Sequence, residues 1–498
     1  MNILFENCTF GSNLTDKTFS NSRPMMTVEP IETTDIQRVF EEQRNNASII
    51  ALTTAKERIE KLKKIQTYLL AHLEEIQRAM YDDFRKPSAE VMLGEVYSIT
   101  SEIKFACKRL KRWMQPQRLA TPLSLIGTSS YIKHEPKGNV LIISPWNYPL
   151  ALAMKPLISA IAAGNTAIVK PSEMTPNTSR FIKKMMGELF KENEVAVFEG
   201  DAAIASELLK LPFNHIFFTG APAIGKVVMR AAAEHLASVT LELGGKSPNI
   251  IDETADIKKV AEMTAWSKCL NNGQTCISAD YVLIHESKKE EFIRAYSNTI
   301  KKMYDTDRQG VENSDSYAQI VNNRHFNRLK NYLDDAVAKG AKIEMGGRTI
   351  ANQNFMEPTL LSNVNDEMLV MQDEIFGPIL PVLTYRDKEE VINYINGKEK
   401  PLALYIHSRN NKNREYFLNN TSAGDTVIND LMLQFSNPEI PFGGVNNSGI
   451  GKSNGFFGFQ EFSNLRGVTQ RRFGTMNFIY PPYTDKVKKL IDLLVKYF

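Results

Sequence analysis

Cysteine is scarce in this chain of 498 residues. The four cysteines, at positions 8, 107, 269 and 276, form no C-x-x-C pair. This pattern excludes a disulfide framework and a zinc site of ordinary spacing. We therefore expect free thiols, no bound metal, and a reducing compartment such as the cytoplasm.

Excess charge and long apolar runs are also lacking. The 60 basic and 57 acidic residues leave a net charge of only +3, so no nucleic-acid partner is indicated. No apolar run approaches the ~20 residues that span a bilayer. Residues 1–24 are rich in Asn, Ser and Thr and lack the charged start and apolar core of a secretory signal. We expect residues 1–26 to be a poorly ordered extension.

Hydrophobic periodicity divides the chain into several parts, and its length favours two or three domains. Apolar residues recur every three or four positions over 59–76 and again from Ser88 to about Trp113, which indicates two helices. From Asn139–Ser144 and Thr166–Lys170 onward, short apolar segments alternate with helical ones, and a second alternation covers about 248–429. The pattern predicts an α/β fold with two parallel, doubly wound domains.

Two further segments differ from this alternation. Residues 119–133 alternate Ser and Thr with Leu and Ile, which predicts an extended arm of the kind that pairs with another element or subunit. In the tail, Val487, Leu490 and Ile491 share one helical face while lysines lie elsewhere. We expect this amphipathic helix to dock on its own protein, with membrane-surface contact as the alternative.

Two residues near the boundary between the two alternations could perform chemistry. Glu242 follows an apolar run, and Cys276 ends a Gly-Gln-Thr turn before a predicted strand. A thiol with an unperturbed pKa of ~8.5 is mostly protonated at pH 7 and needs a base. A nearby carboxylate can take a proton from the thiol, or from a water that attacks a thioester. We predict Cys276 as nucleophile and Glu242 as base, although a lone Cys is more often a buried hydrophobe, as expected of Cys107 and Cys269.

Other candidate residues are weaker when each is taken alone. Asn147 follows a predicted strand and could donate to an oxyanion, or could satisfy its own backbone. Lys170 and Glu173 could bind ribose hydroxyls, or could form an ordinary surface turn. Gly220 and Gly225 lie between a strand and a helix, but their spacing is G-x-x-x-x-G rather than the dinucleotide signature G-x-G-x-x-G.

Together, these residues belong to six motifs that stand in the order found in the aldehyde dehydrogenase superfamily. From about residue 35 to 472 the chain resembles that family, and three further segments resemble its class 3 branch, which includes fatty- and aromatic-aldehyde enzymes. The six motifs are Pro145-Trp-Asn-Tyr-Pro149, Lys170-Pro-Ser-Glu173, Phe218-Thr-Gly220, Leu241-Glu-Leu-Gly-Gly-Lys-Ser-Pro248, Gly273-Gln-Thr-Cys276 and Glu374-Ile-Phe-Gly-Pro378, and the three segments are Arg324-His-Phe326, Lys400-Pro-Leu-Ala-Leu-Tyr405 and Pro441-Phe-Gly-Gly444.

The resemblance implies a domain organisation and a homodimer. An NAD(P)-binding domain would comprise 27–114 and 139–241, and a catalytic domain 242–431. An oligomerisation arm would comprise 115–138 and 432–472, followed by a tail, 473–498. One subunit's arm would extend the other subunit's sheet.

The resemblance also implies the reaction, which oxidises a medium- or long-chain aliphatic or an aromatic aldehyde to the acid. Cys276 would attack the carbonyl, and the Asn147 amide and the Cys276 backbone N–H would hold the oxyanion. Hydride loss to the nicotinamide would leave a thioester, which water activated by Glu242 would hydrolyse.

For the cofactor, NAD or NADP, the resemblance implies binding without the usual glycine signature. Lys170 and Glu173 would hold the adenosine ribose, and Glu374 the nicotinamide ribose; the charge of Glu173 would favour NAD, although class 3 members often accept NADP. The residues expected to bind the cofactor are Trp146, Lys170, Glu173, Gly220, Ala221, Pro222, Ala223, Ile224, Gly225, Glu374 and Phe376.

Two positions depart from the family pattern, and three other functions are alternatives. Gln434 and Asn454 stand where the family often has histidine, so the identity of the aldehyde stays open. The alternatives are a cofactor-independent ester or thioester hydrolase using Cys276 and Glu242, an acyl transferase to coenzyme A, and a catalytically silent protein that keeps the fold.

Overall fold

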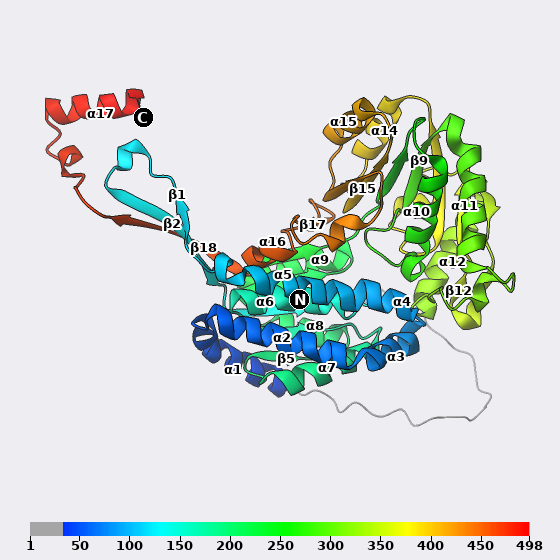
Figure 1. The fold of residues 1–498 in the computed structure, drawn as a ribbon, viewed down its shortest axis with the longest axis horizontal. Coiled ribbons are helices and arrows are strands. Elements are labelled where there is room, and N and C mark those ends of the chain that lie inside the picture. The colour runs from blue at the N-terminus through cyan, green and yellow to red at the C-terminus, as the bar shows by residue number, and fades with distance from the viewer. Residues whose placement is uncertain (1–32, 498) are drawn as a thin grey trace.

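The computed structural model describes residues 33–497, so the extension predicted at 1–26 lies outside the described residues. The described chain contains two mainly parallel sheets with helices around them, and a separate antiparallel arm (Figure 1). The predicted α/β fold is therefore confirmed.

The first sheet has six strands in the order β17-β7-β6-β3-β4-β5. Its strands are parallel except β17, which pairs antiparallel with β7. The central strands β3, β4 and β6 are buried along their whole length, which explains their unbroken apolar sequences. The bounds are β3 (Asn139–Ile143), β4 (Thr166–Lys170), β5 (Val195–Val197), β6 (His215–Thr219), β7 (Ser238–Glu242) and β17 (Gly449–Ile450), with α6 (Ala151–Ala163), α7 (Pro176–Leu189), α8 (Ala202–Leu209) and α9 (Pro222–Glu234) between strands.

Helices from the start of the described chain pack on this sheet. Leu62 and Leu69 of α2 and Ile103 of α5 are fully buried in one cluster with residues of α6. The helix predicted from Ser88 to Trp113 contains a π-helical stretch, η1, and π turns often occur near functional sites. The bounds are α1 (Thr33–Ala51), α2 (Ala55–Ala71), α3 (Leu73–Phe84), α4 (Ser88–Glu90), η1 (Val91–Tyr97) and α5 (Ser98–Trp113).

The second sheet has seven strands in the order β10-β13-β14-β9-β8-β15-β16, parallel except for the edge strand β10. The sequence pattern did not predict β10 and β13. The strands are β8 (Pro248–Ile251), β9 (Tyr281–His285), β10 (Lys342–Met345), β13 (Thr359–Ser362), β14 (Ile379–Tyr385), β15 (Ala403–His407) and β16 (Asp425–Ile428). The helices are α10 (Ile257–Cys269), α11 (Lys289–Tyr304), α12 (Asn323–Ala338), α13 (Leu369–Gln372), α14 (Lys388–Asn396) and α15 (Asn411–Asn420), and a two-stranded sheet joins β11 (Thr349–Ile350) to β12 (Phe355–Met356).

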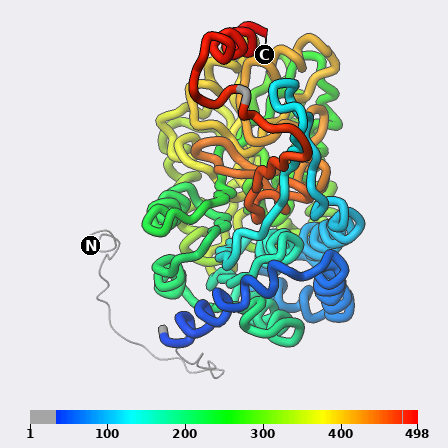
Figure 2. The backbone as a smooth tube through the Cα atoms, turned by 90° about the vertical axis from the view of Figure 1, so that its left-hand side faces the viewer, coloured from blue at the N-terminus to red at the C-terminus, as the bar shows by residue number. Residues whose placement is uncertain are grey.

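The arm projects from the body as a three-stranded antiparallel sheet, and the C-terminal segment runs beside it in both views (Figure 1, Figure 2). Strand β18 pairs with β2 from Ser463 opposite Pro136 to Arg471 opposite Thr128. The elements are β1 (Gln117–Leu119), the 3-10 turn η2 (Leu123–Leu125), β2 (Thr128–Pro136), β18 (Ser463–Arg471) and α17 (Asp485–Tyr497).

Before it enters the arm, the C-terminal segment returns to the first sheet. Gly449 of β17 pairs with Glu242, the last residue of β7. Helix α16 (Gly455–Glu461) follows, and its Phe459 joins the buried cluster of α5 and α6. The segment therefore supplies side chains close to Glu242, while the predicted division into domains stays a prediction.

Candidate active site

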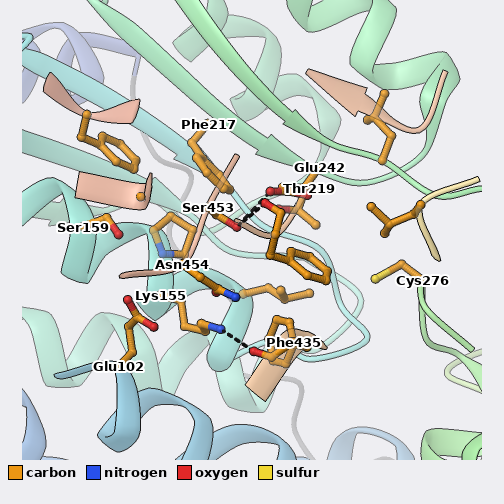
Figure 3. Close-up of a pocket in the computed structure, with 17 residues that line it drawn as sticks. Glu102, Lys155, Ser159, Phe217, Thr219, Glu242, Cys276, Phe435, Ser453 and Asn454 are labelled. Atoms are coloured by element: carbon orange, nitrogen blue, oxygen red, sulfur yellow. Dashed lines mark hydrogen bonds between the residues drawn. The ribbon is translucent and has the colours of Figure 1, made fainter. Parts of the chain in front are cut away.

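Two cavities meet at Cys276 and Glu242. The larger has a volume of about 1120 Å³ and the smaller about 40 Å³, and both residues line both of them. Figure 3 shows the smaller cavity with these two side chains among its lining residues. A reactive sulfur and a carboxyl group thus lie where two differently shaped ligands could approach each other.

The loop that carries Cys276 has an unusual backbone. Asn271, Asn272 and Gly273 have φ angles of 52°, 56° and 70°, a left-handed region that Asn and Gly adopt most readily. At Gly273 a Cβ atom would lie 2.3 Å from the carbonyl oxygen of Gly377, so no larger residue fits. The tight reversal turns the chain from α10 towards β9, and Cys276 lies between them.

Asn147 joins this loop to the loop after β3. Its Nδ2 donates to the Gln274 carbonyl at 3.1 Å, and its own carbonyl accepts from Asn271 Nδ2 at 2.8 Å. The side chain is buried and lines the larger cavity. The amide is held beside Cys276, with a second N–H that can serve an oxyanion.

A buried ion pair contacts the backbone carbonyl of Asn147. Lys86 Nζ lies 2.7 Å from Glu95 Oε1 and donates to the Asn147 carbonyl at 3.2 Å. Glu95 Oε2 accepts from the N–H of Ala151, at the start of α6, at 2.7 Å. Both charged side chains are fully buried, so each compensates the other. Sequence reasoning missed this pair; its signal was Glu95 next to Val96, on the apolar face of a predicted helix.

Glu242 is the last residue of β7. Its two carboxylate oxygens differ in their hydrogen bonding. Ser453 Oγ donates to Oε1 at 2.9 Å, whereas Oε2 has no hydrogen-bond partner among residues 33–497. Burial raises the pKa of Glu242 to about 8, opposed by the Ser453 hydrogen bond. A base with a pKa near the working pH is suited to proton transfer.

Cys276 keeps its proton in the resting site. Burial raises the pKa of its thiol, and the negative charges of Glu374 and Glu242 raise it further. Formation of the thiolate therefore requires a base. Cys107 is half-buried and Cys269 is fully buried, and both are free thiols.

The larger cavity contains some of the predicted cofactor residues and not others. Its walls do not include Lys170, Glu173, Ile224 or Gly225. Lys170 ends β4 and forms an ion pair with Glu173 at 2.9 Å. The predicted residues that do line it are Trp146, Asn147, Gly220, Ala221, Pro222, Ala223, Glu374 and Phe376.

Glu374 lines this cavity and lies against a glycine turn. A Cβ atom on Gly244 would lie 2.0 Å from Glu374 Oε2, so the carboxyl group occupies space that only glycine leaves free. Burial raises its pKa to about 8, and Asp280 contributes. Arg328 donates to the backbone carbonyls of Glu374 at 3.5 Å and Phe376 at 3.4 Å, which fixes the segment.

These features fit a nicotinamide dinucleotide. The volume exceeds that of most small-ligand pockets. The turn from Gly220 to Pro222 places the N-terminus of α9 at the carboxyl edge of a parallel sheet, where phosphate groups are bound. Glu374 can accept from ribose hydroxyls, and Trp146 and Phe376 supply aromatic surface at a ring-centroid distance of 5.3 Å.

The smaller cavity is mainly apolar. Its aromatic lining residues are Phe217, Phe435, Phe442 and Phe462. Asn454 also lines it, whereas Gln434 does not; Gln434 Nε2 is buried and donates to the Tyr405 hydroxyl at 3.4 Å. The polar lining residues are Glu102, Lys155, Ser159, Thr219, Glu242, Ser453 and Asn454.

Sequence reasoning missed Glu102, Lys155 and Ser453. Lys155 carried a signal, because it is the single charged residue in the otherwise apolar helix Ala151–Ala163. Within 33–497 no group of three or more His, Cys, Asp or Glu is placed to hold a metal ion. The same range has no helix of sufficient length and apolarity to cross a membrane.

The chain is similar to known proteins over most of its length. The model described as "Aldehyde dehydrogenase family" matches residues 14–468. A relative from Bacillus subtilis (strain 168), "Putative aldehyde dehydrogenase AldX", is 45% identical and covers 87% of this chain and 97% of its own. "Aldehyde dehydrogenase family 3 member A2" of Mus musculus is 38% identical, covering 89% and 90%.

Solved structures share the fold. "Substrate bound state of Staphylococcus Aureus AldH" superposes with a TM-score of 0.87 at 40% identity and covers 92% of this chain and 99% of that chain. An NAD+ complex of an aldehyde dehydrogenase from Bacillus cereus superposes with a TM-score of 0.80 at 28% identity, covering 88% and 89%. These matches confirm the family resemblance, including its class 3 branch.

Proposed function

This chain belongs to the aldehyde dehydrogenase family, and from that premise we propose that it oxidises an aliphatic or aromatic aldehyde to the carboxylic acid with NAD or NADP. One observation carries the proposal: Cys276 and Glu242 line both cavities. An aldehyde in the smaller cavity would meet the sulfur from one side, and the cofactor in the larger cavity would face the same carbon from the other.

The first step is attack of Cys276 on the aldehyde carbonyl. Because burial holds the thiol protonated, the thiol must lose its proton before the sulfur attacks. Water in the larger cavity can accept that proton, which leaves the Glu242 carboxylate free for the last step. The oxyanion is stabilised by the Asn147 amide, which the Lys86–Glu95 pair positions through the Asn147 carbonyl. A thiohemiacetal on Cys276 results.

The second step requires a hydride acceptor, which the bound nicotinamide supplies. Glu374, Trp146 and Phe376 would hold the nicotinamide end, and Gly220 to Ala223 the pyrophosphate. Lys170 and Glu173, with Ile224 and Gly225, stay predicted cofactor residues although they lie outside the cavity wall; Lys170 and Glu173 would bind the adenosine ribose at the end of β4.

The last step hydrolyses the thioester on Cys276. Glu242 in its carboxylate form takes a proton from water, which then attacks the acyl carbon. Its pKa of about 8 leaves it partly protonated at neutral pH, so hydrolysis should accelerate as the pH rises through 8. The acid product leaves and the thiol is restored.

The test is a spectrophotometric survey of straight-chain and aromatic aldehydes with each dinucleotide, combined with identification of the product. Growth of the reduced-nicotinamide band with release of the free acid supports the proposal. Ester cleavage without such growth would favour the hydrolase, acyl-coenzyme A the transferase, and no reaction of any kind the silent protein. Cys276→Ala is the control for background reduction.

A homodimer built on the arm is the second part of the proposal. Large apolar side chains of the arm and tail are solvent-exposed in the single chain, and such a surface on an antiparallel sheet favours pairing with a second copy. The exposed residues are Leu119, Leu123, Leu125, Ile126, Leu465, Phe473, Tyr480, Tyr483, Leu493, Val495 and Tyr497. Sedimentation equilibrium tests this; a monomer at micromolar concentration would contradict it. A cytoplasmic location stays a prediction. Docking of α17 on its own protein also stays a prediction, with contact at a membrane surface as the alternative.

A further inference from the structure

One end of the smaller cavity is polar although its walls are aromatic. In Figure 3, Glu102, Lys155 and Ser159 lie on the opposite side of the cavity from Cys276, and Asn454 lies next to Lys155. The mechanism above uses none of these four side chains. They come from α5, α6 and the residue before α16, so the fold brings together segments far apart in sequence.

Lys155 is buried with hydrogen-bonding capacity to spare. Its Nζ donates to the Phe435 carbonyl at 3.4 Å and lies 3.7 Å from the centre of the Phe435 ring. An ammonium group has three N–H donors, and the Phe435 carbonyl accounts for one of them within residues 33–497. Burial lowers the pKa of Lys155 to about 8, while Glu102 and Glu242 favour its charged form.

Asn454 provides the second, independent observation. Its side chain is 3% exposed, and neither amide atom has a hydrogen-bond partner among the described residues. An unsatisfied buried amide is costly, and native structures satisfy nearly all such groups. Because Asn454 lines the cavity, a molecule bound there can complete both hydrogen bonds.

The chemistry of the bound group follows from the set of donors and acceptors. Lys155 and Asn454 Nδ2 donate. Asn454 Oδ1 and the Glu102 carboxylate, one oxygen of which already accepts from the Gly455 N–H at 2.7 Å, accept. Since one cation and one anion share the site, a charged group would be attracted by one and repelled by the other. A neutral hydroxyl, which both donates and accepts, satisfies both kinds of partner.

We propose that this polar end binds a hydroxyl group at the end of the substrate remote from its aldehyde carbon, and that the preferred substrates are hydroxylated aromatic aldehydes. A cavity that holds an aromatic ring measures about 150 Å³, whereas this one measures about 40 Å³, so the phenylalanine side chains of the wall must move apart to contact the ring. Lys155, Asn454 and Glu102 then bind the hydroxyl. The inference rests on the proposed function, because it names the substrate class of the same site.

The test measures kcat/KM for two series of different length, benzaldehydes and phenylpropanals, each unsubstituted or carrying a para-hydroxyl, para-methoxy or para-carboxylate group. The methoxy compounds match the hydroxyl compounds in electronic effect but cannot donate. We expect the hydroxyl compound to exceed both the unsubstituted and the methoxy compound by about tenfold in at least one series, as one hydrogen bond to a charged group allows. Preference for the carboxylate, or no preference in either series, would overturn the proposal.

Variants of Lys155 and Asn454 test whether these two residues cause the preference for the hydroxyl compounds. Lys155→Met keeps the length of the side chain without the donor, and Asn454→Gly suits the φ of 72° at this position. Each should reduce the hydroxyl preference to within about threefold of unity, while Lys184→Met on the exposed face of α7 keeps it. Variants that retain the full preference would refute the assignment.

Binding of unreactive alcohols separates this inference from the proposed function. Calorimetry compares phenylpropanol with its para-hydroxy derivative on the wild-type protein and on Asn454→Gly. Tighter binding of the hydroxylated alcohol that the variant loses supports the site even if no aldehyde were oxidised. Equal binding overturns the site even if aldehydes are turned over.

Discussion

The two cavities that meet at Cys276 are lined by different kinds of residue. The larger is lined by glycines after β6 and β7 together with several charged side chains, and Glu374 lies against Gly244. The smaller is shaped by side chains of α5, α6 and the C-terminal segment. A wide cavity lined by glycines and charged side chains suits a large polar ligand such as a dinucleotide. A narrow cavity lined by aromatic side chains suits the apolar part of an aldehyde.

The first prediction concerns Cys276, which lines both cavities. Cys276→Ala should reduce aldehyde oxidation at least a thousandfold, about 4 kcal/mol of barrier, because no other thiol of residues 33–497 lines either cavity. Dinucleotide affinity, measured by fluorescence titration, should stay within about threefold. Turnover above a tenth of wild type would refute the nucleophile, and lost dinucleotide binding would mean that the two cavities are not independent.

The second prediction concerns Glu242, which also lines both cavities. Its replacement should affect the first burst of reduced cofactor and the steady-state turnover differently. Glu242→Gln should slow steady-state turnover about a hundredfold, and the first burst of reduced cofactor much less, because thioester hydrolysis needs the carboxylate. Stopped-flow measurements distinguish the phases. Equal losses in both would show that Glu242 also deprotonates the thiol.

The pH profile provides a further check on Glu242. Burial raises its pKa to about 8, so the carboxylate fraction grows from pH 7 to 9 and the hydrolysis rate should grow with it. The rate should then level off above pH 9, and the glutamine variant should show no such rise. A wild-type rate already at its plateau at pH 6 would contradict this assignment.

A change confined to the larger cavity should affect the cofactor alone. Glu374→Gln removes the carboxylate proposed to accept from the nicotinamide ribose, and the KM for the dinucleotide should rise about tenfold, or about 1.4 kcal/mol. The KM for the aldehyde should change little. Comparable rises in both KM values would show that Glu374 holds the catalytic loop rather than the cofactor.

The smallest effect is expected for a change confined to the smaller cavity. Phe442 packs against Phe435 with ring centroids 5.3 Å apart, and Phe442→Leu should raise the aldehyde KM about threefold through lost aromatic contact. The dinucleotide KM should be unchanged. Phe292→Leu, an equally buried aromatic position of α11 outside both cavities, controls for general loss of stability.

Much of the fold was predictable because buried parallel strands are short, continuous apolar segments. Asn139–Ser144 and Thr166–Lys170 correspond to β3 and β4 with little change of bounds. The edge strand β10 escaped prediction, since it is largely exposed and carries charges that resemble a loop. Strand β13 also escaped prediction, although all four of its residues are buried. The π-helical stretch 91–97 has no local sequence signature, because it depends on how the helix packs.

The residues of the site also divide into those that local sequence predicts and those that only packing brings together. Cys276, Glu242 and Asn147 could be identified from short motifs, because each requires a particular residue type in a particular turn. Lys155 and Asn454 could not be paired, since about 300 positions separate them in the sequence and only the packing of α16 against α6 brings them to one cavity.

The sequence by itself determined which chemical groups the chain carries and which local turns present them: a thiol after a Gly-Gln-Thr turn, a carboxylate at the end of a strand, and an amide in a loop. Only the tertiary structure decided how those groups behave. Burial, not residue type, raises the pKa of Glu242 into the working range and keeps the Cys276 thiol protonated. The physical reason is that desolvation and the distance between charges depend on packing, which segments far apart in the sequence create together.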